Sequence, residues 1–384
     1  MRSLYKVVLA ISFVVLIVSS SRALPKYASR TGYKCQSCHI NPTGKGMRNE
    51  LGSSYGRDDI TLATFKDATD YDDFSTKLGP NISFGADYRS MFYYESKNKT
   101  STFFQMQGAL YVNLRLTKRF SIYADKDLFG DPEVFGLARI LPMDGYVKIG
   151  KFIPAYGTKV DDHNYFIRGG PYNPGVQFGG SFPAGYPTGL RFGELSEDTG
   201  LELGFAPSIF TFNIGLFDGL PGVNLPTTGT RNKSVALRGD ARFAIGGVNL
   251  NVGGSYYDSP SATDRHTFYG AFGAVTLFRD LTLTSEVDYV EHATHDAPTT
   301  VGIAWWNELN WMVVQGIDLK LAYESYDPDK DLQNGIFSQV TVGAEFFVMS
   351  GVEVRPLYRI NMNKLPNNGN ANTNEFLAMF HFFI

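Results

Sequence analysis

The strongest constraint on the fold is an alternation of apolar and polar residues that runs from residue 81 to the C-terminus. In residues 317–327, for example, Asp318, Lys320 and Glu324 alternate with apolar side chains. Successive side chains of a strand point to opposite faces, so this period predicts strands with one apolar and one polar face. The sequence contains sixteen such segments: 81–95, 102–117, 120–129, 133–141, 145–153, 199–207, 209–218, 232–245, 248–258, 264–278, 281–292, 299–315, 316–327, 336–350, 352–363 and 373–384.

The connections between these segments alternate in length. Tight turns such as 142–145 and 350–351 alternate with polar loops such as 218–232 and 364–373. Short turns on one rim and longer loops on the other are typical of outer-membrane barrels, whose strand number is even in bacterial single-chain members. We therefore predict an all-β fold: a 16-stranded transmembrane outer-membrane β-barrel over residues 80–384, with both termini on the periplasmic side.

The predicted strands also indicate which side chains face lipid. Met106 is expected on the lipid-facing side and Gln105 on the lumen side, while Trp305 and Trp311 would join an aromatic girdle at the membrane interface. A soluble β-sandwich or propeller is the alternative, and it would need one buried face and a covered edge. The last segment favours the barrel because it ends in an apolar stripe: Phe376, Ala378, Phe380, Phe382 and Ile384.

The composition excludes several other classes of protein. A formal net charge of −3 excludes a nucleic-acid binder that works through a basic patch. Two cysteines among 384 residues cannot form a disulfide scaffold. Beyond the N-terminus, no stretch approaches the roughly 18 apolar residues of a membrane helix.

The N-terminus has the pattern of a signal peptide over residues 1–23. Arg2 and Lys6 precede an apolar run over 7–18, and small residues at Ser21 and Ala23 suit a cleavage site. An N-terminal membrane anchor is the alternative, but the apolar run is too short to span a bilayer. We therefore expect export to the bacterial outer membrane.

Both cysteines belong to one motif, Cys35-Gln36-Ser37-Cys38-His39, which is the pattern for covalent c-type haem attachment. In that chemistry the two thiols add to the haem vinyl groups, and the following imidazole becomes the proximal ligand of the iron. A redox-active CxxC pair and half of a zinc site are the alternatives, and zinc would need further Cys or clustered His nearby. The motif predicts one haem c, carried by a segment over residues 24–79.

The distal haem ligand is left open by the sequence. Met47 is the candidate thioether ligand, and a thioether would raise the reduction potential. The alternative is that Met47 only packs on the haem face. His163 and an open coordination position are the other options.

The longest connection covers residues 154–198, and loops of this length are usually functional. In barrels such a loop can fold inward and constrict the pore. It contains Asp161, Asp162 and His163, which are either a metal site or an ordinary polar loop. In another loop, His292 and His295 form a similar candidate for a weak surface metal site.

A CxxCH segment directly before a 16-strand barrel resembles the fused monohaem c-type cytochrome–porins of the bacterial outer membrane, best known in iron-oxidising bacteria. The likeness is carried by Tyr27-Ala28-Ser29-Arg30-Thr31-Gly32, the haem motif after it and the barrel behind. In that family, an aromatic-Ala-x-Arg/Lys-Thr-Gly run precedes the haem cysteines.

The resemblance implies electron transfer through one haem inside the pore. The donor or acceptor would be extracellular, with Fe(II) a candidate, and a periplasmic c-type cytochrome or other redox carrier would exchange electrons on the inner side. The alternative function is a porin for small solutes or anions, in which the haem segment gates or senses. A third is a haem-dependent surface enzyme acting on a small oxidant, although no nucleophile–base pair or paired acid for hydrolysis is apparent.

Overall fold

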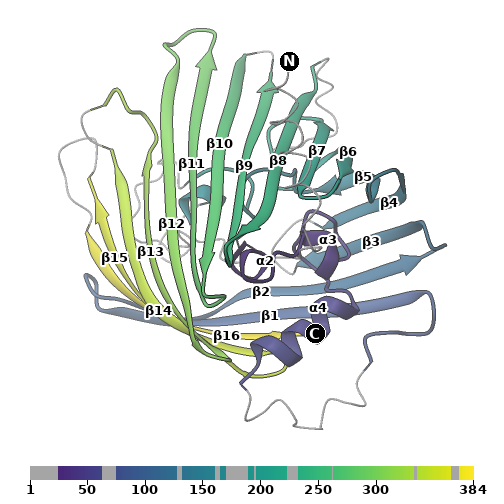
Figure 1. Ribbon diagram of the computed structural model, residues 1–384. Coiled ribbons are helices and arrows are strands. Elements are labelled where there is room, and N and C mark those ends of the chain that lie inside the picture. Colours follow the sequence, from purple (N-terminus) through teal and green to yellow (C-terminus); the bar gives the residue numbers. More distant parts are fainter. Residues whose placement is uncertain are drawn as a thin grey trace, which may run out of the picture.

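The computed structural model describes residues 25–62, 75–127, 132–160, 165–169, 189–193, 196–222, 232–261, 263–332, 335–364 and 372–384. Within these residues, sixteen antiparallel strands close into one barrel (Figure 1). Each strand pairs with its neighbours in the sequence, and β1 closes the sheet against β16, with Met91 opposite Met379. The predicted 16-stranded all-β barrel is confirmed.

The strands begin and end within two residues of the predicted segments. Their bounds are β1 Ile82–Glu95, β2 Thr100–Arg115, β3 Phe120–Asp127, β4 Glu133–Leu141, β5 Gly145–Phe152, β6 Asp198–Phe205, β7 Phe210–Phe217, β8 Ser234–Ile245, β9 Val248–Pro260, β10 Asp264–Leu277, β11 Leu281–Thr294, β12 Thr300–Val314, β13 Ile317–Asp327, β14 Phe337–Met349, β15 Val352–Asn363 and β16 Thr373–Phe383. The pattern of period two therefore locates nearly every strand end.

The two faces of the barrel wall differ in polarity. Trp305 and Trp311 face outward and are 46% and 52% exposed, as predicted. Charged side chains face the lumen, where Lys148, Glu286 and Arg359 are fully buried. An outward apolar surface that surrounds a closed sheet is stable against lipid and unfavourable in water. The chain is therefore an outer-membrane barrel, located in the bacterial outer membrane.

One prediction of facing is wrong because β2 contains a β-bulge. Arg89 pairs with Gln107 and Ser90 with Gln105, which leaves Met106 as the extra residue. A bulge moves the following side chains to the opposite face of the sheet. Met106 is consequently buried in an apolar cluster of the lumen instead of facing lipid, and Gln105 is on the outward side.

The N-terminal segment lies inside the barrel, at the rim that carries the short turns (Figure 1). Arg30 Nη2 donates to Asp280 O at 3.3 Å, and Asn249 Nδ2 donates to Arg30 O at 2.9 Å. Short turns face the periplasm in such barrels, so the segment occupies the periplasmic half of the lumen. Its helices are α2 Pro25–Thr31, α3 Cys35–Cys38, α4 Glu50–Tyr55 and a π-helical turn Gly56–Ile60.

None of the described helices is long and apolar enough to cross a membrane. The predicted signal peptide, residues 1–23, lies outside the described residues. Of the predicted haem segment 24–79, the structure describes residues 25–62 and 75–79.

The long connection between β5 and β6 folds into the lumen in its described parts. Thr158 N–H donates to Glu286 at 2.6 Å, and Phe166 N–H donates to Glu324 at 2.7 Å. Phe166 begins the short 3-10 helix Phe166–Arg168. These contacts bring the loop against the inner wall, above the N-terminal segment.

The facing of β14 can be tested with an outward Arg. Val342 is 48% exposed on the outer face near the middle of the strand. Val342→Arg should lower the free energy of unfolding in lipid by about 2–4 kcal/mol, because an Arg at the bilayer midplane is poorly solvated. Ser338→Arg, outward but at the loop end of the same strand, should cost about 0–1 kcal/mol. Equal costs in urea unfolding from vesicles would contradict this placement of the wall.

Candidate functional site

The CxxCH motif forms a single helical turn followed by a tight hairpin. His39 N–H donates to Cys35 O at 3.0 Å and closes the turn. His39 then pairs with Arg48 in an antiparallel bridge, and Asn49 N–H donates to Cys38 O at 2.8 Å. The backbone of Cys38 and His39 is therefore held on both sides, before α4 begins at Glu50.

The tip of this hairpin is bound to the barrel wall by a buried lysine. Lys148 Nζ on β5 lies 3.3 Å from Asn41 Oδ1 and 3.3 Å from Thr43 Oγ1. The same ammonium group lies 2.9 Å from a carboxylate oxygen of Glu202. Because Lys148 is fully buried, these partners replace its lost hydration and hold the hairpin in a defined position.

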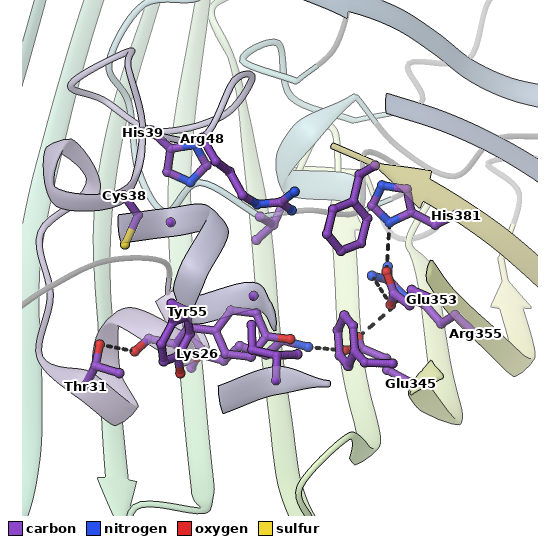
Figure 2. A pocket seen from close by; sticks show the side chains of 18 of the residues that line it. Lys26, Thr31, Cys38, His39, Arg48, Tyr55, Glu345, Glu353, Arg355 and His381 are labelled. Carbon is purple, nitrogen blue, oxygen red and sulfur yellow. Dashed lines mark hydrogen bonds and ion pairs between the residues drawn. The ribbon is translucent and has the colours of Figure 1, made fainter. Parts of the chain in front are cut away.

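Cys38 and His39 line a cavity enclosed by three parts of the chain (Figure 2). The empty space within it, including the open mouth, is about 1020 Å³. The N-terminal segment, the barrel wall and the inward loop all contribute, the loop through Val160 and Tyr165. Aromatic side chains form much of the wall: Tyr27, Tyr33, Tyr55, Tyr165, Trp306, Phe347 and Phe383.

Ion pairs tie α2 to the wall beside this cavity. Lys26 pairs with Glu345 on β14 (Figure 2). Arg30 donates two hydrogen bonds to the carboxylate of Asp318, at 2.9 and 2.6 Å. Burial alone would lower the pKa of Arg30, but the hydrogen bond and charge of Asp318 outweigh it and raise that pKa. Burial and then the carboxylates of Asp318 and Glu345 raise the pKa of Tyr27.

A second charged group adjoins the first, on the part of the cavity wall where β15 and β16 pair (Figure 2). Arg355 Nε lies 3.5 Å from a carboxylate oxygen of Glu345 and joins the two groups. His381 Nδ1 lies 2.8 Å from Glu353, whose carboxylate also lies 2.8 Å from Arg355. The sequence pattern gives no sign that Glu353, Arg355 and His381 lie near the haem motif. Only barrel closure brings β15, β16 and residue 39 to one cavity.

The two cysteines line different cavities in this conformation. Cys38 lines the large cavity with His39, whereas Cys35 lines a neighbouring cavity of about 430 Å³ with Arg242 and Tyr146. The two thiols form no disulfide. Attachment of both thiols to one group would require Cys35 to turn toward Cys38, within a helix of a single turn.

Met47 is buried against the barrel wall. Its N–H donates to Tyr123 Oη at 3.1 Å, and its side chain belongs to the central apolar cluster. Met47 lines neither of the two cavities that His39 lines, so its position gives no support to the distal-ligand prediction. His163, the other named candidate, and its neighbours Asp161 and Asp162 lie outside the described residues.

The side chains around the large cavity include the two kinds of donor that a covalently bound haem needs, a thiol and an imidazole. A thiol and an imidazole open onto it from adjacent positions, Cys38 and His39. Tyr27 Oη and Trp306 Nε1 are buried on its wall without a hydrogen-bond partner among the described residues. Such unsatisfied groups cost free energy unless a ligand or water pairs with them.

The comparison of sequences finds no relative: neither a protein-family profile nor a curated protein matches this chain. Solved structures do resemble it. OmpT of Vibrio cholerae is 13% identical with a TM-score of 0.54, covering 81% of this chain and 100% of that one. OprB of Pseudomonas putida is 12% identical with a TM-score of 0.57, covering 79% and 94%.

An anion-selective porin from Comamonas acidovorans is 10% identical with a TM-score of 0.54, covering 79% of this chain and 99% of that one. At such identities the likeness establishes a shared fold alone. The fold is thus that of outer-membrane porins and channels.

The close packing of α4 on the motif predicts an unusual effect of an alanine. A Cβ at Gly52 would lie 2.3 Å from Cys38 O, so Gly52→Ala should push α4 away from the haem motif. We expect the free energy of local opening at the amides of 49–55 to fall by about 1–3 kcal/mol in hydrogen exchange. Gly56→Ala is the control, because its Cβ would meet nothing within 4 Å. Helix propensity alone predicts slower amide exchange in both variants. That result would contradict the close packing of α4 against Cys38.

Covalent haem at Cys35 and Cys38 has its own test. The double variant Cys35→Ala/Cys38→Ala should lose all haem staining in denaturing gels, because no thioether bond can form. The barrel should still insert, since its strands do not depend on these thiols. Haem stain that persists in the double variant would refute the attachment site.

Proposed function

We propose that this chain is an outer-membrane electron conduit, in which one haem attached at Cys35 and Cys38 and ligated by His39 exchanges electrons between an extracellular donor or acceptor and a periplasmic carrier. One observation carries the proposal: the CxxCH segment lies inside the lumen, and Cys38 and His39 open onto a cavity walled by the barrel and the inward loop. When bound, haem supplies a one-electron iron couple.

The residues of the chain would hold such a group between the two rims. The N-terminal segment enters the lumen from the periplasmic rim, and the described parts of the 153–197 loop enter from the opposite side. The outer-membrane apolar band is about 25 Å tall, so a haem at either mouth would be distant from the other side. A position within the lumen shortens both distances.

The cavity wall also suits the chemistry of a haem. Its aromatic side chains would pack against a macrocycle and exclude water, and the dryness of a haem site together with the identity of the ligands sets the reduction potential. Lys26, Arg48 and Arg355 line the same cavity and would place positive charge near carboxylate substituents, although Lys26 and Arg355 also pair with Glu345 and Glu353. The periplasmic carrier would meet the rim near the short turns, where α2 lies against Asp280.

A porin is the second candidate function, and the similarity to solved porins and channels favours it. In that case, small solutes would pass between the N-terminal segment and the wall. The ion pairs that tie the segment to β13 and β14 argue for a narrow path, because both Arg30 and Asp318 are buried. The two functions differ in what crosses the membrane: an electron conduit passes electrons but not solutes, whereas a porin passes solutes.

A vesicle experiment separates the two functions. Vesicles that enclose oxidised cytochrome c are exposed to Fe(II) chelated on dextran, which is too large to enter the lumen. An electron conduit reduces the enclosed protein, whereas the His39→Ala and Cys35→Ala/Cys38→Ala variants do not. Conductance across planar bilayers should be low for the intact chain. High conductance without reduction of the enclosed protein would refute the conduit and support the porin.

A further inference from the structure

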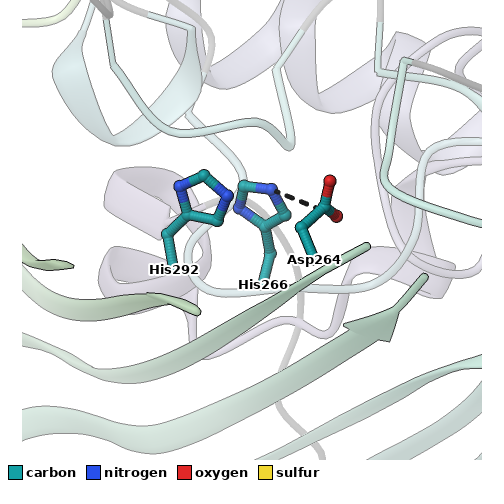
Figure 3. A group of neighbouring side chains, drawn as sticks. All are labelled: Asp264, His266 and His292. Carbon is teal, nitrogen blue, oxygen red and sulfur yellow. Dashed lines mark ion pairs between the residues drawn. The ribbon is translucent and has the colours of Figure 1, made fainter. Parts of the chain in front are cut away.

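Two histidines and an aspartate meet on the inner wall at the outer mouth of the barrel (Figure 3). His266 on β10 and His292 on β11 are directly opposite in the strand register. Their rings stack with centroids 4.0 Å apart, and Asp264 Oδ1 lies 4.0 Å from His266 Nε2. One ligand atom from each of the three lies within 4.8 Å of the others.

The strand geometry explains why these three side chains converge. Residues opposite each other on antiparallel strands have Cβ atoms about 4.5–5.5 Å apart, and residues two apart on one strand share a face. His266 and His292 meet the first condition, and Asp264 and His266 meet the second. The sequence spacing alone pairs His292 with His295. The structure instead places His295 in the exposed loop, bonded through its N–H to Thr263 O at 3.1 Å.

Neighbouring groups orient the candidate ligands. The Ser261 hydroxyl donates to Asp264 Oδ1 at 2.9 Å, and the ring of Phe268 stacks on His266 at 6.4 Å. Arg265 forms its ion pair with Asp258, at 2.7 Å, and so does not neutralise Asp264. Outer contacts of this kind fix ligand orientation in metal sites.

We propose that Asp264, His266 and His292 bind one divalent first-row transition-metal ion at the extracellular mouth of the lumen. Two imidazoles and one carboxylate suit Fe²⁺, Cu²⁺ or Zn²⁺, whereas Ca²⁺ and Mg²⁺ prefer oxygen ligands. All three residues are only partly buried, so an ion can reach them from the outer side. The site is separate from the haem motif and does not require haem.

If the chain conducts electrons as proposed above, the metal site would lie on the path of electrons toward the haem motif. The ring of Phe268, which stacks on His266, lies 5.2 Å from the ring of Phe192. Phe192 lines a cavity that His39 also lines. A redox-active ion bound at the mouth would therefore lie at the outer end of packed aromatic side chains that lead toward the haem motif.

Zinc titration of the intact, haem-loaded chain in detergent tests the site. We expect one Zn²⁺ per chain by calorimetry, and a loss of affinity of about tenfold or more in His266→Ala and in His292→Ala. His295→Ala is the matched control and should bind as the wild type does. The site is refuted if the wild type binds no Zn²⁺, or if His295→Ala weakens binding as much as the other two.

A second measurement separates this site from the haem motif and from misfolding. Copper(II) bound to the wild type should show the hyperfine signature of two imidazole nitrogens in electron paramagnetic resonance, and His292→Ala should retain one. The signature should persist in Cys35→Ala/Cys38→Ala, so that failure of the proposed haem function leaves this result intact. Loss of the signature in that double variant would place the metal at the CxxCH segment and overturn the proposal. Each variant must retain the gel shift of a folded barrel.

Discussion

The rest of the structure depends on one constraint: charged side chains on the inner wall of the closed barrel are buried and need partners of opposite charge. The inner wall buries carboxylates such as Asp318 and Glu286, and an unpaired buried charge is costly. Arg30 of the N-terminal segment binds the first, and Arg168 of the inward loop binds the second at 2.8 Å. Removing one partner of such a pair typically costs about 3–5 kcal/mol. Ion pairs with the inner wall therefore hold both the N-terminal segment and the inward loop in place.

This arrangement has a direct consequence for the haem motif. Cys38 and His39 lie in a segment too short for a core of its own, and it obtains its fixed position from wall residues such as Lys148 and Tyr123. The cavity beside the motif is then shaped by strands that are far apart in the sequence. The proposed electron conduit would need such a fixed segment, because the distance over which an electron is transferred must stay constant.

The two proposed sites lie at different heights in the lumen. The haem motif belongs to the segment that enters from the periplasmic rim, where Arg30 contacts a short turn, and the Asp264, His266 and His292 group lies at the outer loops. They come from different elements and use different donors, so each can be tested without the other. The aromatic cluster between them, which includes Phe192 and Phe268, is part of the central core of the barrel.

The sequence by itself determined the strand pattern, the number of strands and the haem motif. These are local properties, because side-chain alternation, turn length and the spacing of Cys35, Cys38 and His39 are all read along the chain. It erred at Met106, since the bulge that turns this residue inward is defined by the pairing of β2 with β1.

Tertiary structure alone decided what lies beside the motif. The charged wall of Glu353 and His381, the inward course of the long loop and the pairing of His266 with His292 all depend on strands that meet only after the barrel closes. Sequence spacing suggested His295 as the partner of His292. Antiparallel register instead selected His266, because residues directly opposite in a sheet approach more closely than residues three apart along an extended strand and its loop.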